Sequence, residues 1–254
     1  MEKEELLQKR FQELAVSAQR RDRVTFTDFL NLNEQNILHQ LLQKFSWIKG
    51  ETFGGYEGAE RCVAAFFPED WKEKTGEELT WPISCIRVAP LQRKFAEQLT
   101  HRDILGALMN LGIERSRTGD IAVCDGEFFV FCSSSMAELI CRELCRIRHT
   151  IVSCTFCEQG DFKYTPDVQT IRGSVASVRL DSVMALAFQS SRSSLLSLIE
   201  DAKVFVNGKL ITTNAYTLKP GDLVSVRGMG KFRYVDVTGQ TKKGRNMVEL
   251  ERFI

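Results

Sequence analysis

The sequence predicts an α+β protein built from several domains. Helix-period and strand-period patterns alternate along the chain, and a polar stretch containing Gly76 interrupts them just before Pro82. A chain of 254 residues with 43% hydrophobic and 26% charged residues is long enough for two or three ordinary globular domains. The predicted division is an N-terminal α/β region over 1–80, a central domain over 81–160, a linker over 161–178 and a C-terminal domain over 179–254.

The first 80 residues predict two helices and a hairpin. Apolar residues at helical spacing predict an amphipathic helix over roughly the first twenty positions: Leu6, Leu7, Phe11, Leu14 and Ala15. A turn and a second helix follow, N-capped by Asn33, with Ile37, Leu38, Leu41 and Leu42 on its apolar side. Strands around 48–53 and 61–67, joined by a glycine-rich turn from Gly54 to Gly58, predict the hairpin.

Residues 82–156 predict the element order β-α-β-β-α-β. "ISCIRVAP" is a strand, and 93–112 are helical with Gly112 as the C-cap. A hairpin turns at Asp125-Gly126, a second helix starts on a Ser cap, and "TIVSCTF" closes the unit as a strand. Met136, Leu139, Ile140 and Leu144 mark the apolar side of that second helix. This order is the ferredoxin-like arrangement that RNA-recognition domains also use.

Two features of the central domain raise the question of RNA contact. In "EFFVFC", Phe129 and Phe131 share one face of a strand while Phe128 lies on the other. Either face could stack bases, but such phenylalanines usually belong to a core, and the basic and glycine residues of the stacking motif are missing. The loop "GIERSRTGD" offers Arg115 and Arg117 as better candidates for phosphate contact, with simple solvation as the alternative.

The eight cysteines are scattered over apolar stretches, which is typical of reduced thiols in a cytoplasmic protein. Cys154 and Cys157 form a C-x-x-C, but in a strand they would point to opposite faces, and no second pair completes a zinc site. Cys141 and Cys145 share a helical face and receive the same interpretation. We therefore expect buried thiols, no metal and no cofactor. No apolar run reaches the ~18 residues of a membrane helix, and the charged N-terminus does not resemble a targeting peptide.

The net charge of +1 conceals an asymmetry along the chain. Residues 170–254 hold 13 Lys and Arg against 7 Asp and Glu, a net charge of +6. Residues 1–169 hold 21 against 26, a net charge of −5. A basic C-terminal surface is what a nucleic-acid-binding protein needs, although a basic face without a partner is also common.

The basic end carries a series of short motifs in a defined order. Two helices are predicted near 180–188 and 193–202, with Ser190 and Ser191 as caps between them, followed by strands with turns at Asn207-Gly208 and Pro220-Gly221. This stretch of roughly 60 residues resembles an S-four (S4, alpha-L) domain, a small RNA-binding module. The resemblance rests on Arg179-Leu180-Asp181, Ser191-Arg192-Ser193, Ile199, the run from Lys203 to Gly208, Pro220-Gly221-Asp222, Val224 and Val226.

In an S4 domain the two helices and the following hairpin pack on structured RNA. The start of the second helix favours a phosphate, to which Arg192 can make a bidentate contact, while Lys203 and Lys209 act as point charges. The alternative is that Ser191 only caps the helix and Arg192 is solvated. The predicted RNA-binding residues are Arg179, Ser191, Arg192, Ser193, Lys203, Asn207, Lys209, Arg227, Lys231 and Arg233.

Catalytic patterns are weak. Pseudouridine synthases use an Arg-Leu-Asp with a catalytic Asp, but here Arg179-Leu180-Asp181 opens the S4 helix with no catalytic domain downstream. Asp181 is better interpreted as a carboxylate at a helix N-terminus that pairs with Arg179. The chain has no nucleotide-binding signature, and none of its three His residues lies beside a candidate nucleophile. We expect a binding protein rather than an enzyme.

The whole chain resembles the YlmH family of bacterial S4 proteins. The resemblance is carried by "RDILGALMNLGIERSRTGDI" and by the strand from Pro82 to Pro90. It implies binding to ribosomal RNA and tRNA on a large ribosomal subunit that carries peptidyl-tRNA, where the protein assists C-terminal tailing of stalled chains alongside other quality-control factors. Two alternatives stay open: a cell-division adaptor acting through protein contacts, and an RNA-modifying enzyme using Asp181.

Overall fold

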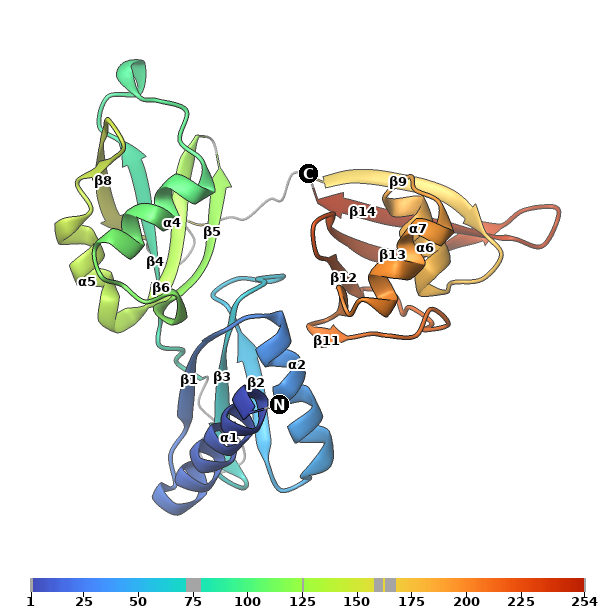
Figure 1. The fold of residues 1–254 in the computed structure, drawn as a ribbon, viewed down its shortest axis with the longest axis horizontal. Helices are drawn as coiled ribbons and strands as arrows, with labels where there is room; N and C mark the ends of the chain where they lie inside the picture. The colour runs from blue at the N-terminus through green and yellow to red at the C-terminus, as the bar shows by residue number, and fades with distance from the viewer. Residues whose placement is uncertain (1, 72–78, 125, 158–161, 163–167, 254) are drawn as a thin grey trace. The chain divides into compact units, whose positions relative to one another are not determined.

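The chain forms two compact units, residues 1–164 and 165–254. The computed structural model describes residues 2–71, 79–124, 126–157, 162 and 168–253, and three sheets lie within them. Figure 1 shows one small sheet near the N-terminus, a larger one in the central region and the largest at the C-terminus. None of the helices among these residues is both long and apolar enough to cross a membrane.

The N-terminal region packs two helices on a three-stranded antiparallel sheet. The strand order is β1-β3-β2. The elements are α1 (Glu2–Arg21), β1 (Thr25–Leu30), α2 (Leu32–Lys44), β2 (Lys49–Phe53) and β3 (Cys62–Phe67). Phe11 of α1, Leu38 of α2 and Phe66 of β3 are completely buried in the shared core. Both predicted helices and the hairpin are confirmed.

Two predictions about this region are wrong. Thr25–Leu30 form strand β1, where only a turn was predicted, because these residues pair with β3 in the sheet. Helix α2 is capped by Asn31 rather than by Asn33. The Asn31 side chain accepts from the Glu34 N–H at 3.2 Å, and the Glu34 carboxylate accepts from the Asn31 N–H at 2.7 Å, a reciprocal capping box.

The central region confirms the ferredoxin-like prediction. Its sheet has the order β5-β6-β4-β8-β7 with all neighbours antiparallel, and α4 and α5 share a core with the sheet. The elements are β4 (Ile83–Pro90), η1 (Arg93–Phe95), α4 (His101–Asn110), η2 (Arg115–Arg117), β5 (Thr118–Cys124), β6 (Glu127–Ser133), α5 (Ser134–Glu143), β7 (Arg146–Ile147) and β8 (Thr150–Phe156). The hairpin turn is confirmed at Gly126, and Asp125 lies outside the described residues.

Helix α4 is shorter than predicted. It begins at His101 and not near residue 93, where only the single 3₁₀ turn η1 is found. Thr100 caps α4. The Thr100 backbone N–H donates to the Asp103 carboxylate at 2.8 Å, so a second capping box fixes the start of this helix. Its end is confirmed: Gly112, with a φ of +78°, follows the last turn, where a left-handed residue terminates a helix.

All eight cysteines are free, but the prediction that they are buried is confirmed only for Cys62 and Cys132; five others are partly buried and one is exposed. Cys145 is exposed, because α5 ends at Glu143 and Cys145 therefore does not share a helical face with Cys141. Cys154 packs against the core beneath α4 and α5, whereas Cys157 packs against the cluster on the opposite sheet face, as predicted. Within the described residues, no three His, Cys, Asp or Glu side chains are grouped to hold a metal.

Thiol reactivity should follow this burial. Burial raises the pKa of the Cys62, Cys132 and Cys154 thiols to about 12, so they stay protonated and unreactive at neutral pH. We expect iodoacetamide to modify Cys145 first in the native protein and all eight cysteines after unfolding, as measured by mass spectrometry over time. Modification of Cys62 at the rate of Cys145 would contradict this.

Because unfolded thiols ionise near pH 9, the stability that the Cys62, Cys132 and Cys154 thiols confer is complete below that pH and declines above it.

The C-terminal unit packs two helices on one face of a six-stranded sheet (Figure 1). The strand order is β11-β10-β12-β13-β14-β9. The elements are β9 (Val168–Val175), α6 (Leu180–Ala187), α7 (Arg192–Glu200), β10 (Val204–Val206), β11 (Lys209–Leu210), β12 (Leu223–Val226), β13 (Gly230–Gln240) and β14 (Asn246–Phe253). The predicted helices and both turns of the S4 stretch are confirmed.

The predicted linker over 161–178 is wrong for residues 168–175. These residues form β9, which pairs with the whole of β14, from Val168 opposite Phe253 to Val175 opposite Asn246. Gly173 lets α6 approach the strand, since a Cβ there would lie 2.5 Å from the Leu186 side chain. Residues 163–167 lie outside the described residues, and the predicted domain boundaries stay predictions.

Candidate nucleic-acid interface

Helices α6 and α7 form a compact helix-turn-helix whose apolar sides face the C-terminal sheet. Leu180 and Val183 of α6 and Leu195 and Ile199 of α7 are almost completely buried in that core. The remaining side chains at the start of α7 are left exposed, because the helix uses only one stripe for packing. The polar start of α7 is therefore available to a partner.

The start of α7 is built as predicted around Ser191. Its hydroxyl accepts from the Ser194 N–H at 3.3 Å and lies 3.0 Å from the Ser193 hydroxyl. The predicted cap Ser190 instead bonds back to the Phe188 carbonyl at 3.1 Å. Ser191 therefore caps the helix, and within the described parts of the chain no hydrogen bond pairs the N–H groups of Arg192 and Ser193.

Arg192 is the exposed cation at this helix start. Among the described residues, no carboxylate pairs with its guanidinium, and the residues around it from Ser191 to Ser194 are also exposed. A guanidinium that is not already paired can make a bidentate contact with an external phosphate. The geometry thus leaves Arg192 free for the role that the sequence predicts.

Three of the predicted basic residues meet at one end of β10 and β12. The Arg227 N–H donates to the Lys203 carbonyl at 3.0 Å, and Lys231 lies opposite Ser225 on the neighbouring strand. Lys203 pairs with Asp201 at 2.9 Å, an exposed contact that water and salt weaken. The Arg227 guanidinium lies over the Phe205 ring at 5.3 Å and the Lys231 amine over the Phe253 ring at 4.8 Å. We call Lys203, Arg227 and Lys231 the basic strand end.

Asn207 has a structural role in the β10–β11 turn. Its φ of +49° and the +75° of Gly208 are the left-handed values of a tight hairpin turn. Its amide donates to the Asp222 carboxylate at 2.8 Å, and its carbonyl accepts from the Leu223 N–H at 2.9 Å. Lys209 follows this turn and is exposed. Asn207 thus positions the turn that presents Lys209.

The structure confirms the predicted pairing of Arg179 with Asp181. The guanidinium Nε lies 3.2 Å from the carboxylate, and Asp181 is only 6% exposed at the first turn of α6. The Arg179 side chain remains 41% exposed, so part of it still faces solvent. Arg233 faces Glu251 across β13 and β14 at 3.8 Å. The RNA contacts of these two arginines stay predictions.

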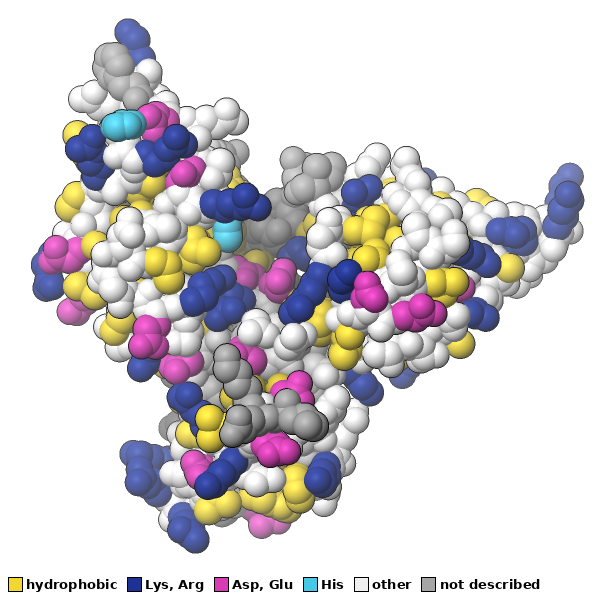
Figure 2. Space-filling view, viewed as in Figure 1, with side chains coloured by type: hydrophobic (Ala, Val, Ile, Leu, Met, Phe, Trp, Pro, Cys, Tyr) yellow, Lys and Arg dark blue, Asp and Glu magenta, His cyan; other side chains and the backbone are white. Residues whose placement is uncertain are grey.

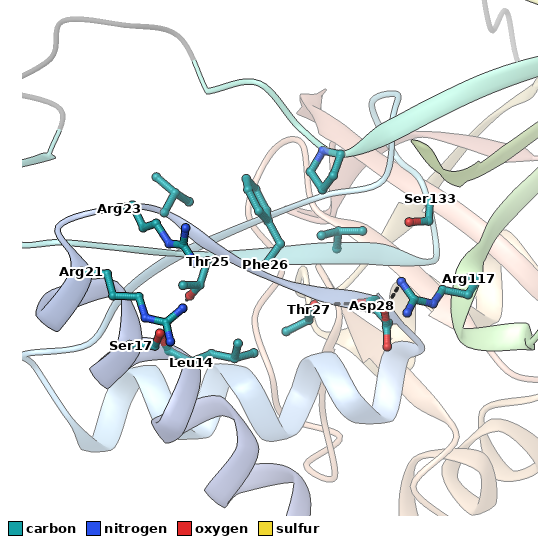
Figure 3. Close-up of a pocket in the computed structure, with 13 residues that line it drawn as sticks. Leu14, Ser17, Arg21, Arg23, Thr25, Phe26, Thr27, Asp28, Arg117 and Ser133 are labelled. Atoms are coloured by element: carbon teal, nitrogen blue, oxygen red, sulfur yellow. Dashed lines mark hydrogen bonds and ion pairs between the residues drawn. The ribbon is translucent and has the colours of Figure 1, made fainter. Parts of the chain in front are cut away.

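Arg115 and Arg117 are engaged within the N-terminal unit. Arg115 donates to the Thr118 and Gly119 carbonyls at 2.8 and 3.0 Å, and burial lowers its pKa to about 10. Arg117 pairs with Asp28 at 3.2 Å at the edge of a cavity of about 500 Å³ that Arg21 and Arg23 also line (Figure 3). Arg115 therefore stabilises its own loop, and phosphate contact by either arginine stays a prediction.

The phenylalanine face of the central sheet is covered. Phe129 and Phe131 share that face, as predicted, and are 7% and 2% exposed. The Tyr56 ring lies 4.9 Å from Phe131, and the Phe162 ring lies 4.9 Å from Phe129. Phe128 packs in the core on the opposite face. The structure does not present these rings for base stacking, and the interpretation as core residues is the one that it supports.

The basic tip of the β13–β14 hairpin is a feature that sequence reasoning missed. Lys242, Lys243 and Arg245 lie in this turn and are exposed. Figure 2 shows Lys and Arg side chains gathered at the outer end of the hairpin. The run "TKKGR", with a glycine between basic residues, was the signal that could have identified a charged turn.

Comparisons with known proteins cover nearly the whole chain. Three family models match it: the YlmH N-terminal region at residues 3–71, the YlmH RNA-binding domain at 81–160 and the S4 domain at 178–224. The ribosome-associated protein quality control protein P2 of Bacillus subtilis (strain 168) is 32% identical over 235 residues, 91% of this chain and 88% of the relative. The small ribosomal subunit protein uS4 of Hahella chejuensis is 41% identical over 54 residues, 21% of this chain and 26% of that protein. The solved cell division protein ylmH from Streptococcus pneumoniae is 21% identical with a TM-score of 0.49, covering 61% of this chain and 92% of that one.

Proposed function

Because this chain belongs to the YlmH family of S4-domain proteins, we propose that it binds structured RNA on the ribosome and acts in ribosome-associated protein quality control. The similarity to the B. subtilis protein P2 over 91% of the chain supports the cellular role. The observation that carries the binding role is the unpaired, exposed Arg192 at the start of α7. In this proposal the RNA belongs to a large subunit that still carries peptidyl-tRNA, and the protein assists C-terminal tailing in the cytoplasm.

The chemistry of the surface favours recognition of RNA shape rather than sequence. The start of a helix carries partial positive charge and unpaired N–H groups, to which Arg192 adds a full charge. The basic strand end adds three more cations, and contacts of cations with phosphates position a protein without reading the RNA sequence. Phosphate contacts of this kind position a protein on folded RNA.

The geometry around Asp181 favours a binding role over catalysis. The enzyme alternative would need Asp181 to reach a substrate. Its carboxylate is buried and is held by the Arg179 guanidinium, and the Ser182 hydroxyl lies 3.5 Å from it. A carboxylate in these contacts serves as a support for the first turn of α6.

The test is sedimentation of the full chain with purified large ribosomal subunits, with and without peptidyl-tRNA, over a salt series. We expect R192A/K203A to reduce the magnitude of the slope of log affinity against log salt by about 1.4 to 1.8, since each of the two phosphate contacts contributes about 0.7–0.9. Lys9 and Lys49 are exposed lysines of the N-terminal unit, so K9A/K49A is a control of equal net charge. We expect this control to bind like the wild type.

Two outcomes would redirect the proposal. Cosedimentation that R192A/K203A leaves unchanged would move the contact away from the S4 surface. Absence of cosedimentation at every salt concentration would reject the ribosomal role, and the cell-division adaptor would become the better hypothesis.

A further inference from the structure

The β13–β14 hairpin extends the C-terminal sheet beyond the part that the S4 family model matches. That match covers residues 178–224, whereas β9, β13 and β14 lie outside it. Val248, opposite Val237, is completely buried and is the last core residue of β14 toward the tip. Beyond that pair, three strand residues of β13 and the turn continue outward by about 10 Å. Figure 1 shows this hairpin running past the helices that cover the sheet.

The outer part of the hairpin has a uniform chemical character. The segment 238–246 contains Lys242, Lys243 and Arg245 and no Asp or Glu, so its charge is +3. Its other members are Thr, Gln, Asn and Gly, and none is a large apolar residue. We call residues 238–246 the basic arm.

The arm is held in a defined conformation, so its charges are preorganised. The Thr241 N–H donates to the Arg245 carbonyl at 2.8 Å, and Gly244 closes the turn with a φ of +73°. Arg245 donates to the carbonyl and hydroxyl of Ser174 on β9, at 2.8 and 3.2 Å. A third strand therefore braces the tip, which a two-stranded hairpin alone would lack.

Lys242 and Lys243 have no role in this framework. Both are exposed, and within the part of the chain that the structure describes neither makes a hydrogen bond or an ion pair. Two adjacent cations held at the tip of a braced arm repel one another and are stabilised by an external polyanion. Their position suits a partner with closely spaced negative charges.

We propose that the basic arm is a second RNA-contact surface, in which Lys242 and Lys243 bind the phosphate backbone of structured RNA. This inference rests on the proposed RNA-binding function. The partner is RNA rather than a lipid surface, because a membrane-binding tip needs apolar or aromatic side chains and the arm has none. The basic arm does not recognise a particular RNA sequence, since lysines act as point charges toward phosphates.

The experiment compares full-length wild type, K242A/K243A and K242R/K243R in salt-dependent binding to purified large ribosomal subunits. We expect K242A/K243A to reduce the magnitude of the slope of log affinity against log salt by about 1.4 to 1.8. The loss of affinity relative to the wild type is then roughly 25- to 60-fold larger at about 0.1 M salt than at 1 M salt. K242R/K243R should bind like the wild type, because the charges remain.

Further variants and controls distinguish failure of this inference from failure of the proposed function on which it rests. If K242A/K243A leaves the slope unchanged while R192A/K203A loses binding, the basic arm does not contact RNA, and the proposed function stands. Equal losses in K242A/K243A and K9A/K49A would assign the effect to net charge and overturn the inference as well. Wild type that fails to bind subunits at any salt overturns both proposals. Binding to phosphatidylserine vesicles that K242A/K243A abolishes, without an effect on subunits, would assign the arm to lipid instead.

Discussion

The D120A variant is expected to lose about 3 kcal/mol of the free energy of unfolding of the N-terminal unit. Asp120 accepts three hydrogen bonds, from the Tyr56 hydroxyl at 2.8 Å, the Glu60 N–H at 2.7 Å and the Arg61 N–H at 3.1 Å. Hydrogen bonds to a charged group contribute about 1.5–3 kcal/mol each and are not additive within one network. Urea unfolding followed by circular dichroism measures the loss.

The loss of stability in D120A should be large because the hydrogen bonds of Asp120 join the two sheets of the N-terminal unit. Asp120 belongs to β5, whereas its three partners lie on the segment between β2 and β3. Arg61 reinforces the junction: its guanidinium donates to the carbonyls of Thr118 and Phe29, each at 2.9 Å. Loss of the carboxylate removes one of the negative charges near this partly buried guanidinium, leaving those of Glu34 and Glu60.

Matched variants separate the charge from the contacts. D120N keeps one acceptor oxygen and should lose roughly half as much stability as D120A. E138A removes an exposed carboxylate from α5 and should change stability by less than about 0.5 kcal/mol. Equal midpoints for D120A and E138A would show that Asp120 does not join the two sheets.

The elements that could be predicted from the sequence are those with a strong local pattern. The helices α6 and α7 and the Asn207-Gly208 turn each depend on residues within one or two turns of the chain, and the structure confirms them. Strand β9 was mistaken for a linker because most of its residues are partly exposed and its partner β14 lies far along the sequence. Pairing over such a separation leaves no local signal.

The errors at helix ends have a different cause. The caps Asn31 and Thr100 were missed although each has an acidic residue three positions later, which is a recognisable capping box. The burial of Phe129 and Phe131 could not be predicted in the same way. It depends on Tyr56 and Phe162, which come from distant segments and meet them only in the folded unit.

The S4 surface depends on one buried carboxylate that the sequence shows only as part of a turn. Asp222 is 7% exposed, and its two oxygens accept from the Asn207 amide and the Lys219 N–H, each at 2.8 Å. The Tyr234 N–H donates to its backbone carbonyl at 2.9 Å. Asp222 thereby ties the β10–β11 turn, which presents Lys209, to the start of β12 and to β13.

The D222A variant is therefore expected to lose about 3 kcal/mol of the free energy of unfolding of the C-terminal unit, since the buried carboxylate is removed and two part-buried hydrogen bonds lose their charged acceptor. N207A should lose less, because the Asp222 carboxylate remains and keeps its hydrogen bond from the Lys219 N–H. The double variant N207A/D222A should be less destabilised than the sum of the two, with a coupling free energy of about 1 kcal/mol or more measured by urea unfolding. Strict additivity would show that the turn does not depend on the Asn207–Asp222 contact. It would also imply that Lys209 is positioned by the β10–β11 pairing alone.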